Sequence, residues 1–127
     1  MKDKLKQSAV RAAKNAYAPY SGYKVGTALL TETGKIFTGC NVENSSYGLT
    51  ICAERTAVFK AISEGESKFK ELCIYTDSTK LPSPCGACRQ VLSEFSSDLK
   101  VTIISKTEER HSSIGELLPL SFKFEKK

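Results

Sequence analysis

Three cysteines and one glutamate are the residues of this sequence whose types and spacing best suit chemistry. Cys52 and Glu54 stand two positions apart, and Cys85 and Cys88 form a C-x-x-C pair. Three thiolates can hold a zinc ion and leave its fourth position open, as catalytic zinc sites do. A carboxylate beside that open position can move protons, so the pattern predicts metal-assisted hydrolysis with Glu54 as the proton carrier.

Both halves of this pattern stand where a loop passes into a predicted helix. Residues 52–64 and 85–95 carry apolar residues at helical spacing, and each stretch follows a loop. A helix start presents free backbone N–H groups and a positive dipole end, which favours thiolate over thiol. Arg55 is predicted to hydrogen-bond a metal-bound sulfur and to offset the negative charge that three thiolates leave on zinc.

The remaining hydrophobic periodicity predicts the elements that position these residues. Helices are predicted at residues 2–17, 52–64 and 85–95, a short helix or turn at 114–118, and strands at 23–30, 36–42, 72–76 and 101–105. Strands separated by helices favour a sheet with parallel pairs, and a turn at 32–35 makes the first two strands an antiparallel hairpin. Without an internal repeat or a dividing linker, residues 1–127 are predicted to form one domain.

Composition and charge narrow the class of protein. The 127 residues are 40% hydrophobic and 26% charged, as is ordinary for a soluble globular protein. The sequence has no apolar run long enough for a membrane span and no apolar stretch behind its charged start, so neither a span nor a secretory signal is predicted. Five cysteines, an odd number, fit reduced metal-binding thiols and a cytoplasmic location. Much of the net charge of +5 sits near the ends of the chain, so no nucleic-acid partner is expected.

Three further residues could bind metal by type, but their contexts argue otherwise. His111 is the single histidine and stands in the charged run 108–111, so a solvent-exposed loop is expected there. Cys40 and Cys73 fall within strand-like runs and are expected to be small buried hydrophobes.

The zinc motif resembles that of the zinc deaminases, with cysteine in the place of the histidine of H-x-E and with P-C-x-x-C after it. Similarity to the small homotetrameric cytidine deaminases extends over nearly the whole chain, at residues 16–21, 39–44, 47, 52–57, 83–91 and 116–119. The resemblance implies a three-layer α/β/α fold with a mixed five-stranded sheet and one zinc per subunit on Cys52, Cys85 and Cys88. It also implies hydrolysis of cytidine and deoxycytidine to uridine and deoxyuridine with release of ammonia, in pyrimidine salvage.

The resemblance also assigns substrate contacts. Asn41 and Glu43 match a pair that hydrogen-bonds the ribose hydroxyls, which suits an amide and a carboxylate. Tyr23 stands where the family has an aromatic residue, often Phe, against the pyrimidine ring. Tyr47 falls in a loop that helps complete a neighbouring subunit's site, and Phe122 matches an aromatic residue that closes a neighbour's pocket. A free pyrimidine nucleoside as substrate and a homotetramer with shared sites are therefore implied.

One stretch departs from the family pattern. The family commonly has Gly-Ala-Phe after Leu-Leu-Pro, whereas this chain has Leu120, Ser121 and Phe122. Leucine adopts a positive φ less easily than glycine, so the path of the C-terminal tail is the part that the resemblance predicts least.

Other classes of function remain open at the level of sequence. A structural zinc or nucleic-acid-binding module would usually need four protein ligands, and only three are in view. A thiol redox protein would use the C-x-x-C pair at a helix start but leaves Cys52 and Glu54 without a role. Within the deaminases, a nucleoside-like antibiotic or a base inside a nucleic acid is an alternative substrate. The sequence does not rank cytidine against deoxycytidine.

Overall fold

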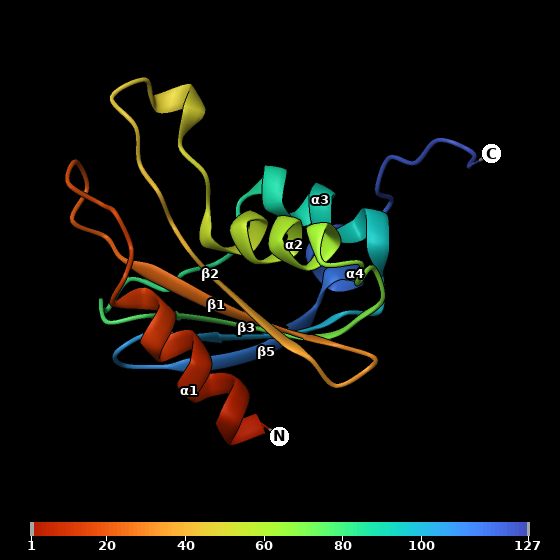
Figure 1. The fold of residues 1–127 in the computed structure, drawn as a ribbon, viewed down its shortest axis with the longest axis horizontal. Helices are drawn as coiled ribbons and strands as arrows, with labels where there is room; N and C mark the ends of the chain where they lie inside the picture. The colour runs from red at the N-terminus through yellow and green to blue at the C-terminus, as the bar shows by residue number, and fades with distance from the viewer. Residues whose placement is uncertain (1, 127) are drawn as a thin grey trace.

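Residues 2–126 are described in a computed structural model of the chain (Figure 1). The elements in chain order are α1 (Lys2–Ala13), β1 (Val25–Thr31), β2 (Ile36–Cys40), the 3-10 turn η1 (Tyr47–Leu49), α2 (Ala53–Ser63), β3 (Phe69–Thr76), α3 (Gly86–Phe95), β4 (Lys100–Ile104), β5 (Glu109–Ser113) and α4 (Ile114–Leu117). Within this described part, none of the helices combines the length and the apolar character that crossing a membrane requires.

Five strands form one mixed sheet in the order β2-β1-β3-β4-β5. β1 is antiparallel to both β2 and β3, β3 and β4 are parallel, and β4 and β5 are antiparallel. Helix α1 lies against one face of the sheet, while α2, α3 and α4 lie on the other, which gives three layers (Figure 1). The predicted α/β/α fold with a mixed five-stranded sheet is therefore confirmed.

The central strand β1 is buried on both of its faces. Leu29 packs into the cluster formed with α2 and α3, whereas Ala28 and Leu30 pack against Leu5 and Ala9 of α1. All seven residues of β1 are buried. Burial on both faces explains why the sequence of β1 does not alternate strictly between apolar and polar residues, since a strand covered on both faces is apolar throughout.

Two element predictions were wrong. Helix α1 ends at Ala13 rather than at residue 17, because a turn follows and Tyr17 pairs with the Asn41–Glu43 segment through backbone hydrogen bonds and a parallel bridge. The run around His111, predicted as a charged loop, is strand β5 along the edge of the sheet. An edge strand with exposed side chains needs no apolar alternation, so its pattern resembles that of a loop.

Helix α2 lies unusually close to the hairpin because of a glycine. A Cβ atom built on Gly39 would come within 2.4 Å of the Ala53 carbonyl oxygen and 2.5 Å of the Ala57 nitrogen. The buried hydroxyl of Thr27, on the neighbouring strand, donates to the same Ala53 carbonyl at 2.9 Å. Gly39 and Thr27 therefore set where the first turn of α2 sits on the sheet.

Replacement of Gly39 by alanine is expected to displace the start of α2. The backbone atoms that the new methyl group would meet cannot move aside cheaply, so we expect a loss of about 1–3 kcal/mol in the free energy of unfolding. Because α2 carries Cys52 and Glu54, zinc content is expected to fall as well. Urea unfolding and elemental analysis measure both effects. Gly48→Ala is the matched control, since its Cβ would have no neighbour within 4 Å. Equal stability of the two variants would contradict the close-approach argument.

Candidate metal and catalytic site

The starts of α2 and α3 bring three cysteine sulfurs together. Cys52 is the N-cap of α2 and Cys85 the N-cap of α3, while Cys88 lies in the first turn of α3. The Sγ atoms of Cys52 and Cys85 are 3.8 Å apart, and those of Cys85 and Cys88 are 3.5 Å apart. All three lie within 4.8 Å of one another.

This donor set fits a zinc ion. With zinc–sulfur bonds of about 2.3 Å, tetrahedral geometry places two ligand sulfurs about 3.8 Å apart. One spacing equals that value and the other is 0.3 Å shorter, so small shifts of the side chains would complete the coordination. Cys88 is buried, Cys52 is partly buried and Cys85 is exposed, so the cluster is reached from the Cys85 side. Three protein ligands leave a fourth position, which distinguishes catalytic from structural zinc sites.

The charges around the cluster favour thiolate at Cys52. A hydrogen bond from the Cys88 thiol, followed by contacts with Arg55 and Cys85, lowers the pKa of Cys52, and the same bond raises the pKa of Cys88. The Arg55 Nη2 donates to Cys52 Sγ at 3.5 Å, and this bond raises the pKa of Arg55. Among the described residues, the buried Nε of Arg55 has no hydrogen-bond partner. Metal binding would displace the proton that the thiols share.

Glu54 lies in the first turn of α2 and is almost fully buried, with 5% of its surface exposed. Burial raises its pKa to about 7, and the charge of Cys52 adds to the rise. Hydrogen bonds from its own backbone N–H and from Cys88, and the charge of Arg55, oppose the rise. A carboxyl group whose pKa lies near neutrality can both accept and donate a proton, which is what an acid–base catalyst requires.

Hydrogen bonds hold Asn41 and Tyr23 to each other and to neighbouring backbone groups. The Asn41 Oδ1 accepts from the Val25 N–H at 2.9 Å, and its Nδ2 donates to the Tyr23 carbonyl at 2.8 Å. The Tyr23 hydroxyl donates to the Lys80 carbonyl at 2.9 Å. Burial raises the pKa of Tyr23, and the charge of Glu54 contributes to that rise. Asn41 keeps one free N–H donor after these bonds.

Glu43 organises the turn at Tyr20 and Ser21. Its Oε1 accepts from the backbone N–H groups of these two residues at 3.0 and 3.1 Å, and its Oε2 accepts from the Ser21 hydroxyl. The Ser21 hydroxyl bond is the main reason why the pKa of Glu43 is lowered. Val42, between Asn41 and Glu43, pairs with Ile51 through two backbone hydrogen bonds. That pairing brings the Asn41–Glu43 segment beside Cys52, although each side chain is partly occupied within the chain.

Tyr47 and Phe122 do not meet in a single chain. Their side chains are 77% and 64% exposed, and η1 and the C-terminal tail lie at opposite ends of the helical layer (Figure 1). Leu120 has a φ of 55°, so the tail keeps a left-handed residue although leucine stands where the family has glycine. That conformation costs roughly 1–2 kcal/mol for a residue other than glycine.

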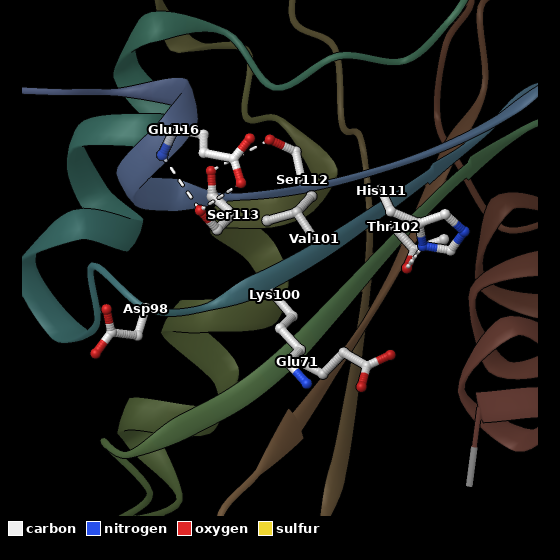
Figure 2. A pocket seen from close by; sticks show the side chains of 9 residues that line it. All are labelled: Glu71, Asp98, Lys100, Val101, Thr102, His111, Ser112, Ser113 and Glu116. Atoms are coloured by element: carbon white, nitrogen blue, oxygen red, sulfur yellow. Dashed lines mark hydrogen bonds between the residues drawn. The ribbon is translucent and has the colours of Figure 1, made fainter.

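A separate groove of about 550 Å³ lies over β3, β4 and β5 (Figure 2). It is lined by Glu71, Asp98, Lys100, Val101, Thr102, His111, Ser112, Ser113 and Glu116. The His111 Nδ1 is 3.2 Å from the Thr102 hydroxyl, and its Nε2 is 3.0 Å from Glu109 Oε2. None of the three clustered cysteines lines this groove, so it is not the metal site.

Sequence reasoning assigned no role to four residues that position the site. Gly39 and Thr27 set the start of α2, as described above. Arg89 and Gln90 follow Cys88 directly, yet their partners lie up to 32 positions away along the chain. The spacing of residues along the chain cannot reveal such contacts. The one signal in the sequence that could have indicated a role for Arg89 is its place directly after the predicted metal ligand Cys88.

Fold and site together define a zinc enzyme of α/β architecture. Residues 1–105 match the family described as "Cytidine and deoxycytidylate deaminase zinc-binding region". The chain is 45% identical over 122 residues to a cytidine deaminase from Sporosarcina psychrophila, covering 94% of this chain and 90% of that protein. It is 32% identical over 108 residues to a blasticidin-S deaminase from Bacillus cereus, covering 79% and 77% of the two chains.

A solved structure agrees with the sequence comparison. The crystal structure of a cytidine deaminase from Burkholderia pseudomallei matches this chain with a TM-score of 0.91 and 44% sequence identity, over 96% of this chain and 99% of that one. The chain belongs to the cytidine and deoxycytidylate deaminase family, and it is a zinc-binding hydrolase that acts on a C–N bond.

Proposed function

We propose that this enzyme converts free cytidine and deoxycytidine to uridine and deoxyuridine, with Glu54 as proton carrier and one zinc ion per subunit on Cys52, Cys85 and Cys88. The observation that carries the proposal is a buried glutamate, with a pKa near neutrality, in the same helical turn as one sulfur of a three-thiolate cluster. Such a carboxyl group serves proton transfer at the open position of a metal rather than ligation.

The residues of the chain divide the chemistry between them. Zinc held by the three thiolates would supply a Lewis acid that makes water acidic near neutral pH. Glu54 accepts one proton from the water that attacks C4 of the cytosine ring and delivers it to ring N3, which makes C4 electrophilic. Glu54 then accepts the remaining proton from the new hydroxyl group on C4 and passes it to the amino group, so that ammonia leaves and C4 becomes the carbonyl carbon of uracil. Arg55 donates a hydrogen bond to Cys52 Sγ and thereby offsets part of the negative charge of the thiolate cluster.

The substrate is held by residues that the chain already fixes in place. Tyr23 offers a ring whose position is set by its hydroxyl bond to Lys80, so the ring can support the pyrimidine. The free N–H of Asn41 and the remaining lone pairs of Glu43 can bind the ribose hydroxyls. A lowered pKa keeps Glu43 ionised and therefore able to accept hydrogen bonds at neutral pH.

Assembly with other copies of the chain would complete the site. Large apolar side chains are exposed on η1, on the outer surface of α2 and along the C-terminal tail; they include Tyr47, Leu49, Phe59, Ile62, Phe122 and Phe124. Exposed apolar groups in this number favour subunit contacts. We infer a homotetramer in which Tyr47 and Phe122 serve neighbouring sites, because one chain keeps them apart. Five unpaired cysteines support a reducing, cytoplasmic location. A role in pyrimidine salvage follows from the proposed nucleoside substrates.

A comparison of substrates tests the proposal. Loss of absorbance at the cytosine band is followed for cytidine, deoxycytidine, CMP, free cytosine and blasticidin S under the same conditions. We expect rapid loss with one or both nucleosides and little with cytosine, which lacks the ribose that Asn41 and Glu43 would bind. A clear preference for blasticidin S would favour the second candidate function, which the Bacillus cereus relative suggests. A preference for CMP or cytosine would contradict a free nucleoside as the substrate.

A further inference from the structure

The guanidinium group of Arg89 joins three separate parts of the chain. Its Nε donates to the Pro84 carbonyl at 2.7 Å, and its Nη2 donates to the Ser83 hydroxyl at 3.1 Å. Its Nη1 donates to the Leu117 carbonyl at 2.8 Å. Three acceptors for one planar fork are more than a solvated surface arginine makes.

The first of these bonds acts directly on a metal ligand. The Pro84 carbonyl belongs to the peptide plane that leads into Cys85, and that plane is rigid. Fixing this carbonyl therefore fixes the direction from which the Cys85 backbone, and with it the sulfur, enters α3. The bond to Ser83 holds the preceding residue as well. Since Cys85 is the exposed member of the cluster, packing alone holds it less firmly than the buried Cys88.

The third bond acts on the start of the C-terminal tail. Leu117 is the last residue of α4, and carbonyl groups at a helix end lack partners within the helix. The adjacent Gln90 donates from Nε2 to the Phe122 carbonyl at 2.9 Å, which holds the tail at a second point. Consecutive residues of α3 thus hold both ends of the segment from Leu117 to Phe122, which contains the left-handed Leu120.

We propose that Arg89 is a positioning residue that fixes the turn carrying the Cys85 ligand and the start of the C-terminal tail at the same time. Zinc retention then depends on Arg89, and the placement of Phe122 depends on Arg89 together with Gln90. Lysine cannot replace it, because an ammonium group has no planar fork that reaches three acceptors in different directions. The part of this inference that concerns the tail rests on the proposed function, whereas the part that concerns zinc does not.

Zinc release without substrate tests the first part. Zinc-loaded Arg89→Lys is mixed with a chromogenic chelator, and release is followed by absorbance, while far-UV circular dichroism reports the fold. We expect release about 10–100-fold faster than in the wild type, as for loss of other groups that orient a ligand. The cobalt-substituted variant is expected to show altered thiolate-to-cobalt absorption, a signature of ligand geometry that a general loss of stability would not produce.

Two variants serve as controls and separate the roles. Arg110→Lys changes an exposed arginine whose ion pair is with Glu108, two residues before it, and is expected to leave zinc release and the cobalt spectrum unchanged. Gln90→Ala frees only the tail, so it is expected to raise KM for cytidine with unchanged zinc release. Arg89→Lys is expected to do both.

Release from Arg89→Lys no faster than from Arg110→Lys would overturn the proposal. If Arg89→Lys does not fold, Ser83→Ala decides, since it removes one of the three bonds at an exposed position; it is expected to release zinc several times faster than Arg110→Lys, and equal rates would overturn the proposal. A chain that failed to deaminate cytidine would leave the zinc-release result standing, so the two failures can be told apart.

Discussion

Replacing Glu54 with glutamine is expected to leave zinc bound and to lower kcat for cytidine by at least about a thousandfold. A single positioned acid–base group typically contributes a factor of about 10²–10⁴ to a rate, and Glu54 is assigned every proton transfer in one turnover. Glutamine keeps the size and one acceptor oxygen of the side chain but cannot carry a proton between water, ring N3 and the leaving amino group.

Zinc content and kcat measured on the same sample separate this role from metal binding. Glu64→Gln is the matched control, because Glu64 is exposed just beyond the end of α2 and is expected to keep full activity. Near-normal turnover in Glu54→Gln would show that another group moves the protons. Loss of zinc together with activity would instead make Glu54 part of the metal-binding structure.

The pH dependence of the wild type follows from the same residue. Proton abstraction needs the carboxylate form of Glu54, so activity is expected to fall as pH drops through its pKa. Burial raises that pKa to about 7, and zinc held by three thiolates would keep a net negative charge, which does not favour the carboxylate form. The acid limb of kcat/KM for the zinc-loaded enzyme is therefore expected near pH 7.

Cys85→Ala is expected to remove zinc and with it all activity. Structural zinc sites in zinc-finger peptides bind with apparent free energies of about 10–16 kcal/mol, so a single ligand accounts for several kcal/mol, and loss of one of three thiolates is expected to weaken binding by a factor of about 10³ or more. Cys85 is the exposed member of the cluster, so its truncation leaves no cavity in the core. Loss of zinc can then be measured without loss of the fold.

Elemental analysis after dialysis measures the effect. Cys40→Ala is the control thiol, since Cys40 lies on β2 outside the cluster, and its zinc content is expected to match the wild type. Full zinc occupancy in Cys85→Ala would show that the metal is held elsewhere or by another ligand. Zinc lost equally from both variants would point to a general effect of removing thiols.

Those parts of the fold whose signals are local in sequence were predicted from the sequence. Helices α2 and α3 were placed to within one residue of their starts, because each is amphipathic and follows a loop. Strand β5 was missed because exposed edge residues carry no apolar alternation, and α1 was made too long because its alanines continue to Ala16 while the backbone turns at residue 14. In each case a tertiary contact, not a local propensity, decides the boundary.

The candidate site also has a part with local sequence signals and a part that depends on tertiary contacts. The three-sulfur cluster was predictable because ligand types and helix starts coincide in the sequence. The bonds that occupy Asn41 and Glu43 within the chain, and the three acceptors of Arg89, join residues 5 to 28 positions apart and leave no pattern. Gly39 matters because it lacks a side chain, and this role is recognised only when the structure shows α2 packed against the glycine.

The most direct test compares zinc-loaded and zinc-stripped enzyme with cytidine as substrate, following uridine and ammonia together. The zinc-loaded enzyme is expected to form uridine and ammonia in equal amounts, the stripped enzyme neither, and added zinc is expected to restore both. Unchanged cytidine with the loaded enzyme, or equal product from the stripped enzyme, would contradict a deaminase whose chemistry depends on the three thiolates and Glu54.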